Sequence, residues 1–230
     1  MKKIIIIGLA LLLTSCSAFK GGQSDEKKTE VKNITFSTKD LPANYFAYVD
    51  IAKVANMPPL DEKLTGYLFE QIAGKETQIR ATIEKSNTMT SKVKDNLCRD
   101  LSGPLCDFNI DIYNGSNFGL KLFEQTSKKP ISETTIVSAP LTSWSIDWIH
   151  SSVKLGESAA TICKDGENSC LNKNATNPLA KLYAICTLRA KNDMDNCLKH
   201  VLSEEESRNF AFNIGYVTGY NISYDVGNQN

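Results

Sequence analysis

Six of the seven cysteines stand in three close pairs, and this grouping constrains the fold more than any other feature of the chain. The pairs are Cys98 with Cys106, Cys163 with Cys170, and Cys186 with Cys197. A metal site is the rival interpretation, but no pair has the CxxC spacing of a zinc site and the chain has only 2 histidines. The pairs therefore predict structural crosslinks, provided that the chain folds in an oxidising compartment.

The first sixteen residues indicate the compartment. Lys2 and Lys3 precede an apolar run from Ile4 to Leu13, and small residues then lead to Cys16. This order of positive charge, apolar core and small residues is typical of a secretory signal peptide. The run has about half of the roughly 20 residues that a helix needs to cross a bilayer. It predicts a signal peptide over residues 1–15 rather than a membrane span.

The tetrad Leu13-Thr14-Ser15-Cys16 resembles the lipobox of bacterial lipoproteins. The resemblance implies cleavage after Ser15 and attachment of lipid, including palmitate, to Cys16. Ser17 follows where that class needs Asp for retention at the inner membrane, so the resemblance implies the outer membrane, facing the periplasm or the cell surface. The alternative is an ordinary signal peptide with an incidental cysteine. No domain family is recognised.

With Cys16 assigned to lipid, an even set of six cysteines remains. The periplasm is oxidising, so an even set in an exported chain predicts disulfides. Six cysteines allow 15 connectivities in principle. Their grouping favours the sequential pairing, 98–106, 163–170 and 186–197.

Composition excludes some classes of partner. The chain has 26 basic and 26 acidic side chains, and loss of the leader with Lys2 and Lys3 leaves it slightly acidic. It has no basic face of the kind that a phosphate backbone requires, so nucleic acid is not expected as a partner. Residues 16–35 form the lipidated N-terminus and a polar tether. Residues 36–140 and 141–230 then form either one domain or two.

We predict an α+β fold that is rich in helix, with the strands in residues 36–140. Alternating apolar residues predict a strand over 45–51, for which a helix starting at Pro42 is the competing interpretation. Two helices follow, over 61–73 and 75–101, and Gly103-Pro104 ends the second. Two alternating segments on either side of Asn114-Gly115 predict a β-hairpin over 108–122, and a short strand is expected at 134–137.

The second region, 141–230, is predicted to be helical and stapled by disulfides. Helices are expected over 143–154, from Asn177-Pro178 onward, and in a short segment ending near Leu202, with a loop over 163–177. Ser203 and Glu206 predict a capping box that starts a final helix to about Asn221. Gly215 and Gly219 in that helix allow another element to approach its backbone closely.

Two patterns suggest hydrolytic chemistry, and a local structural role competes with each. Gly156-Glu157-Ser158-Ala159-Ala160 is one residue from the nucleophile elbow GxSxG, with Asp193, Asp195 and His200 downstream. Its final alanine and the helix before it favour a helix N-terminus instead. Asp147 and His150 could share a helix face, either as an acid–base pair or as a local hydrogen bond. No catalytic residue, cofactor or metal is therefore assigned.

Three functions remain open. The favoured one is a non-enzymatic lipoprotein with a structural or interaction role, held at the membrane by its lipid and bound to an envelope protein or to cell wall. The second is a periplasmic ligand-binding lipoprotein with an aromatic pocket lined by Trp144 and Trp148. The third is a cell-wall or lipid hydrolase that uses Ser158 or the Asp147–His150 pair.

Overall fold

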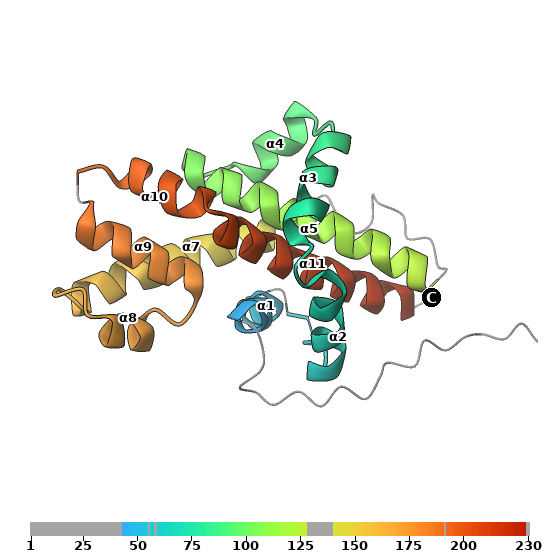
Figure 1. The fold of residues 1–230 in the computed structure, drawn as a ribbon, viewed down its shortest axis with the longest axis horizontal. Coiled ribbons are helices and arrows are strands. Elements are labelled where there is room, and N and C mark those ends of the chain that lie inside the picture. The colour runs from blue at the N-terminus through green and yellow to red at the C-terminus, as the bar shows by residue number, and fades with distance from the viewer. Residues whose placement is uncertain (1–42, 55, 58, 128–139, 191, 229–230) are drawn as a thin grey trace, which may run out of the picture. The chain divides into compact units, whose positions relative to one another are not determined.

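The computed structural model describes residues 43–54, 56–57, 59–127, 140–190 and 192–228. Within these ranges every regular element is a helix and no strand occurs. The helices are α1 Ala43–Val54, α2 Glu62–Ile72, α3 Glu76–Ser86, α4 Ser91–Leu97, α5 Gly103–Ser127, α7 Pro140–Ile162, α8 Asn168–Asn174, α9 Pro178–Arg189, α10 Met194–Ser203 and α11 Glu205–Asn228 (Figure 1). The α+β prediction is therefore wrong, and the described fold is all-α.

The two longest helices, α5 and α11, lie side by side and run parallel (Figure 1). A Cβ atom built on Gly115 would lie 2.0 Å from the backbone oxygen of Phe212, and one on Gly119 would lie 2.1 Å from that of Tyr216. A Cβ on Gly215 would likewise lie 1.9 Å from the oxygen of Ile112. The residue numbers of the contacts increase together along both helices, which shows that the helices are parallel. Only glycine permits this backbone approach.

A buried hydroxyl supplements the glycine contacts. Ser116 Oγ on α5 donates to the backbone oxygen of Ile112 and also lies 3.0 Å from the oxygen of Gly215 on α11. The hydroxyl has one proton, so the two acceptors share it. It satisfies a polar group that the tight packing has removed from water.

The helices pack in three apolar clusters, two of which contain residues of α5 and α11. One surrounds Tyr48, Leu68 and Tyr216 and joins α1 and α2 to α5 and α11. A second surrounds Phe108 and Trp148 and joins α5 to α7, α9, α10 and α11. The third is built largely from the alanines of α7 and α9, which contact α8. The first two clusters place α5 and α11 at the centre of the core.

Three disulfides join the six cysteines in the described part of the chain. They pair Cys98 with Cys106, Cys163 with Cys170, and Cys186 with Cys197. These are the sequential pairs that the spacing favoured, so the disulfide prediction is confirmed. Each bond connects elements that are neighbours in sequence: α4 to α5, α7 to α8, and α9 to α10.

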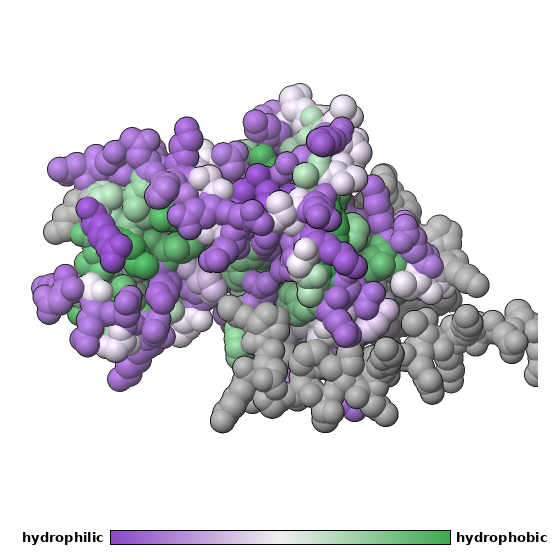
Figure 2. Space-filling model, viewed as in Figure 1, coloured by the Kyte–Doolittle hydropathy of each residue, from purple (hydrophilic) through white to green (hydrophobic). Residues whose placement is uncertain are grey.

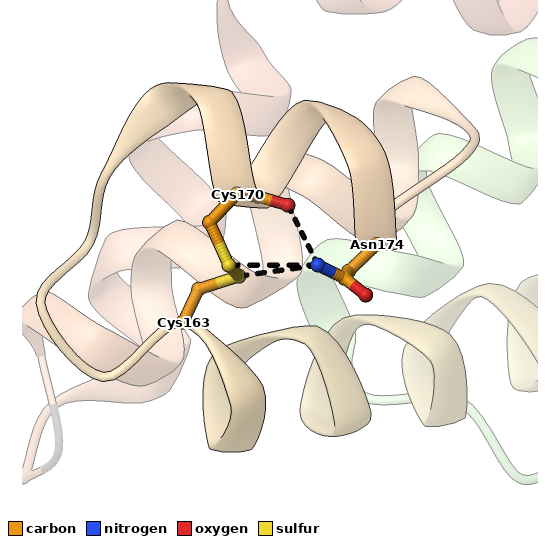
Figure 3. Close-up of a disulfide and its surroundings, with 3 residues drawn as sticks. All are labelled: Cys163, Cys170 and Asn174. Carbon is orange, nitrogen blue, oxygen red and sulfur yellow. Dashed lines mark hydrogen bonds between the residues drawn. A yellow bond between two sulfur atoms is a disulfide. The ribbon is translucent and has the colours of Figure 1, made fainter.

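The disulfide between α7 and α8 has a polar neighbour (Figure 3). The side-chain amide of Asn174 donates to the backbone oxygen of Cys170 at 2.9 Å. The same nitrogen lies 3.6 Å from the sulfur of Cys163 and 3.5 Å from that of Cys170. Asn174 therefore holds the short helix α8 against its own crosslink.

The strand and the hairpin predicted within the described residues are both helical. Residues 45–51 belong to α1, so the competing helix interpretation is the correct one; Ala47, Tyr48, Ile51 and Ala52 are buried at helical spacing. The predicted hairpin over 108–122 is the middle of α5. Its Asn-Gly does not turn the chain, because Gly115 is a packing residue against α11. The short strand predicted at 134–137 lies outside the described residues.

Helix boundaries differ from prediction where polar residues interrupt an apolar stripe. The single helix expected over 75–101 divides into α3 and α4, and Thr90 caps the second by accepting from the backbone nitrogen of Val93. Gly103 begins α5 rather than ending a helix, and the loop expected at 163–177 contains α8.

Of the remaining predicted helix starts, one is confirmed and one is wrong. The helix that begins after Asn177 is confirmed, since the Asn177 side chain accepts from the backbone nitrogen of Ala180 at 2.8 Å. The capping box does not form, because Ser203 ends α10 and its hydroxyl donates to the oxygen of His200. The final helix α11 begins at Glu205 and continues to Asn228.

Candidate functional site

A cavity of about 340 Å³ lies between α5, α10 and the first turn of α11. Its walls combine charged, polar and apolar side chains. They are Pro104, Asp107, Ile110 and Asp111 on α5, Lys199, Leu202 and Ser203 on α10, and Arg208 on α11. Because Asp107 and Asp111 are four residues apart in a helix, both carboxylates lie on one face of α5.

The inner part of the cavity is closed by a bidentate ion pair. Arg208 donates from Nε to Asp111 Oδ2 and from Nη2 to Asp111 Oδ1, each at 2.9 Å. The planar guanidinium matches the two carboxylate oxygens, which fixes both side chains. Asp111 is 3% exposed, so this acid is held almost entirely out of water.

A second acid draws α3 into the same network. Arg208 Nη2 also contacts Glu84 on α3, and Glu84 lies 3.8 Å from Nη1 of Arg80. Arg80 is buried and donates to Asn209 Oδ1 at 3.3 Å. The network therefore alternates in charge from Asp111 to Arg80 and ties α3, α5 and α11 together.

Burial and ion pairing shift the pKa values of Asp111 and Arg208 in opposite directions. Burial raises the pKa of Asp111 above its ordinary value, and the hydrogen bonds and charge of Arg208 offset part of that rise. The hydrogen bonds from Arg208 to Asp111 raise the pKa of Arg208, which stays charged. The pair is therefore a permanent cation facing a carboxylate from which water is excluded.

The outer part of the cavity holds two further charges of opposite sign. Asp107 and Lys199 line it and are exposed. Neither forms an ion pair with any other residue that the structure describes. The outer part thus carries one negatively and one positively charged side chain, and both are available to bind a charged group.

A smaller cavity of about 180 Å³ lies beside α8 and α9. It combines the apolar side chains of Leu171, Ile185 and Leu188 with the charged ends of Lys164 and Arg189. Figure 2 shows an apolar patch over α9, on which Leu182, Ile185 and Leu188 are half-buried.

The structure places the two tryptophans of the predicted aromatic pocket in different apolar clusters. Trp148 is 2% exposed and packs on Phe108 and Phe210, with 6.5 Å between ring centroids in each case. Trp144 packs against the cluster around Tyr48 and Tyr216 instead. Neither tryptophan lines either of the cavities described above.

The predicted hydrolase residues lie on α7 and at α10. Ser158 is exposed in the interior of α7, rather than at a helix N-terminus or on a strand-to-helix turn. His150 Nε2 lies 3.1 Å from the backbone oxygen of Asp100, and the nearby Asp147 points to solvent. His200 is exposed on α10, 3.7 Å from Glu204. Asp193 accepts from Asn196 at 2.9 Å, whereas Asp195 is exposed on α10.

No cluster of His, Cys, Asp and Glu in the described residues could hold a metal ion. Among the described helices, none is both long and apolar enough to span a bilayer. Cys16, the leader and the tether lie outside the described residues.

The sequence patterns missed the charged cavity. Asp111 sits in a stretch that alternates like a strand, and its partner Arg208 is far away in the chain. The one local indication is the spacing of Asp107 and Asp111, which becomes informative only once residues 103–127 are known to be helical.

Comparison with known proteins finds no similar protein. No protein-family model matches the chain, and no curated protein or solved structure matches it significantly.

Proposed function

We propose that this chain is a lipid-anchored protein of the bacterial envelope, with a structural or protein-interaction role rather than an enzymatic one. The observation that carries the proposal is the disulfide pairing. The six cysteines of the described helices pair with one another, which leaves only Cys16 outside the three bonds. Three disulfides are compatible with an extracytoplasmic location.

Cys16 then has a role of its own. It closes the tetrad Leu13-Thr14-Ser15-Cys16, which resembles a lipobox, so it is the residue expected to carry palmitate and become the N-terminus. Ser17 follows it and favours the outer membrane as the place of attachment. A single acyl chain binds membranes only marginally, so stable attachment requires a second signal, such as a further chain on that residue.

Two features support an interaction role over hydrolysis. Ser158 lies in mid-helix, and the two histidines contact the Asp100 backbone oxygen and Glu204 instead, whereas a nucleophile needs a base within hydrogen-bond reach. The apolar patch over α9, with Leu182, Ile185 and Leu188, is the kind of surface that proteins use to contact one another. An envelope protein is the partner expected for it.

Metabolic labelling with an alkyne analogue of palmitate tests the lipid anchor. Wild-type protein should carry the label and partition into the detergent phase of a Triton X-114 extract. Cys16→Ser should lose the label and move to the aqueous phase. A matched variant, Cys98→Ser with Cys106→Ser, also lacks cysteines but should keep the label. An unlabelled wild-type protein with a free Cys16 thiol would refute the proposal.

A further inference from the structure

We propose that the cavity between α5 and α10 binds a small zwitterionic ligand with both an ammonium and a carboxylate group, namely a free amino acid or a short peptide. The inference does not depend on the lipid anchor. It concerns what the helical part of the protein recognises.

The size of the cavity sets the first limit. Its volume of about 340 Å³ lies at the lower end of the roughly 300–1,000 Å³ that ligand pockets occupy. A ligand of that size is a single small molecule of one or two residues, not a folded partner.

The charges set the second limit. Asp111 and Arg208 neutralise each other through two hydrogen bonds of 2.9 Å at the inner part. Asp107 on the α5 wall and Lys199 on the α10 wall have no ionic partner among the described residues. A purely anionic or cationic ligand would leave one of them unmatched. A zwitterion satisfies both, with its ammonium at Asp107 and its carboxylate at Lys199.

The remaining lining suits the same ligand. Ile110, Leu202 and Pro104 offer apolar surface for a short side chain, and the hydroxyl of Ser203 can accept a further hydrogen bond. Arg208 is held by Asp111 and Glu84, so this wall is rigid before any ligand arrives. A preorganised wall lowers the entropy cost of binding.

Isothermal titration calorimetry on the full mature protein in detergent tests the proposal. The probes are L-alanine and L-alanyl-L-alanine, with N-acetyl-L-alanine and L-alaninamide as forms that lack one of the two charges. The uncapped probes should bind, and each capped form should bind about tenfold more weakly or worse, because it loses one charge-assisted hydrogen bond. Tighter binding of the dipeptide assigns the site to peptides, and equal or tighter binding of alanine assigns it to free amino acids.

Two exposed substitutions locate the ligand. Asp107→Asn should weaken L-alanine about tenfold but leave N-acetyl-L-alanine unchanged, because that probe has no ammonium. Lys199→Gln should weaken L-alanine similarly but leave L-alaninamide unchanged. Asp95→Asn and Lys94→Gln, on exposed positions of α4, are matched controls that should bind as wild type.

The opposite results would overturn the proposal. These are no heat with any probe, equal affinity for capped and uncapped forms, or wild-type binding by both Asp107→Asn and Lys199→Gln. Circular dichroism of each variant confirms that the helices are intact before its affinity is interpreted.

Discussion

At the scale of single residues, four glycines decide how closely α5 and α11 approach. Gly115 and Gly119 face the backbone of α11, while Gly215 and Gly219 face that of α5. Glycine is a poor helix former, about 1 kcal/mol worse than alanine in a helix interior. Its presence in two long helices therefore indicates that the free energy gained from the close helix contact exceeds the cost of the low helix propensity of glycine.

Replacing Gly215 by Ala should lower the free energy of unfolding by about 1–3 kcal/mol, the usual cost of overpacking, although alanine is the better helix former. The new Cβ would lie 1.9 Å from the backbone oxygen of Ile112, which cannot move like a side chain. Urea unfolding followed by circular dichroism measures the change.

Gly103 provides the matched control. A Cβ built there meets nothing within 4 Å, so Gly103→Ala should leave the unfolding midpoint unchanged or slightly raised. A Gly215→Ala protein as stable as wild type would show that the two backbones are not in contact.

At the scale of elements, short helices depend on the disulfides. Helix α8 has 7 residues and α10 has 10, fewer than the roughly 12–15 at which an isolated helix is even marginal in water. The bonds Cys163–Cys170 and Cys186–Cys197 attach these helices to α7 and α9, whose packing is more extensive.

Removal of one crosslink, with Cys186→Ala and Cys197→Ala together, should cost about 2–3 kcal/mol through the added freedom of the unfolded chain. The bond closes a loop with a sequence separation of 11, so the entropy loss that it imposes on the unfolded state is moderate. Thermal unfolding of the variant and of wild type gives the difference.

A peptide map of the variant digested without reductant serves as the control, and should still contain the Cys98–Cys106 and Cys163–Cys170 linkages. Scrambled linkages, or a variant that unfolds at the wild-type temperature, would contradict the independent role given to each bond.

Local patterns predicted some elements and failed at others for a physical reason. The helix after Asn177 is predictable because its cap and its proline, Pro178, are adjacent in the sequence. Helices α1 and α5 were missed because alternation and Asn-Gly are local strand and turn patterns. Contacts with distant segments override them here: Tyr48 and Gly115 are both buried in the core around α11.

The candidate site was harder to predict than the helices. Asp111 and Arg208 are 97 residues apart in the chain, and no spacing rule relates residues so distant. The disulfide pairing could be predicted, in contrast, because the paired cysteines are close in the sequence. Trp148 is buried in the core and the partly buried Trp144 packs against it, which is the more usual role of such side chains.

At the scale of the whole molecule, buried tyrosines link stability to alkaline pH. Burial raises the pKa of Tyr48, Tyr216 and Tyr220 above the ordinary value of about 10. Above pH 10 the unfolded chain loses these protons and the folded chain keeps them. The unfolded state then binds fewer protons, so stability that is complete below pH 10 falls as pH rises further.

An alkaline titration followed by the absorbance at 295 nm should therefore show late ionisation of the buried tyrosines. Tyr48, Tyr216 and Tyr220 should ionise only as the helical signal at 222 nm collapses. Ionisation of all 8 tyrosines in one step near pH 10, with the helices intact, would contradict the burial described here.

The parallel pairing of α5 and α11 also has a consequence for biosynthesis. Residues 103–127 emerge from the ribosome well before residues 205–228, yet their glycine-bearing face has no other backbone to lie against. A nascent chain cannot complete its core until translation has nearly finished, and no disulfide of short span can substitute for the missing helix. The core around α11 therefore forms only after residues 205–228 have been synthesised.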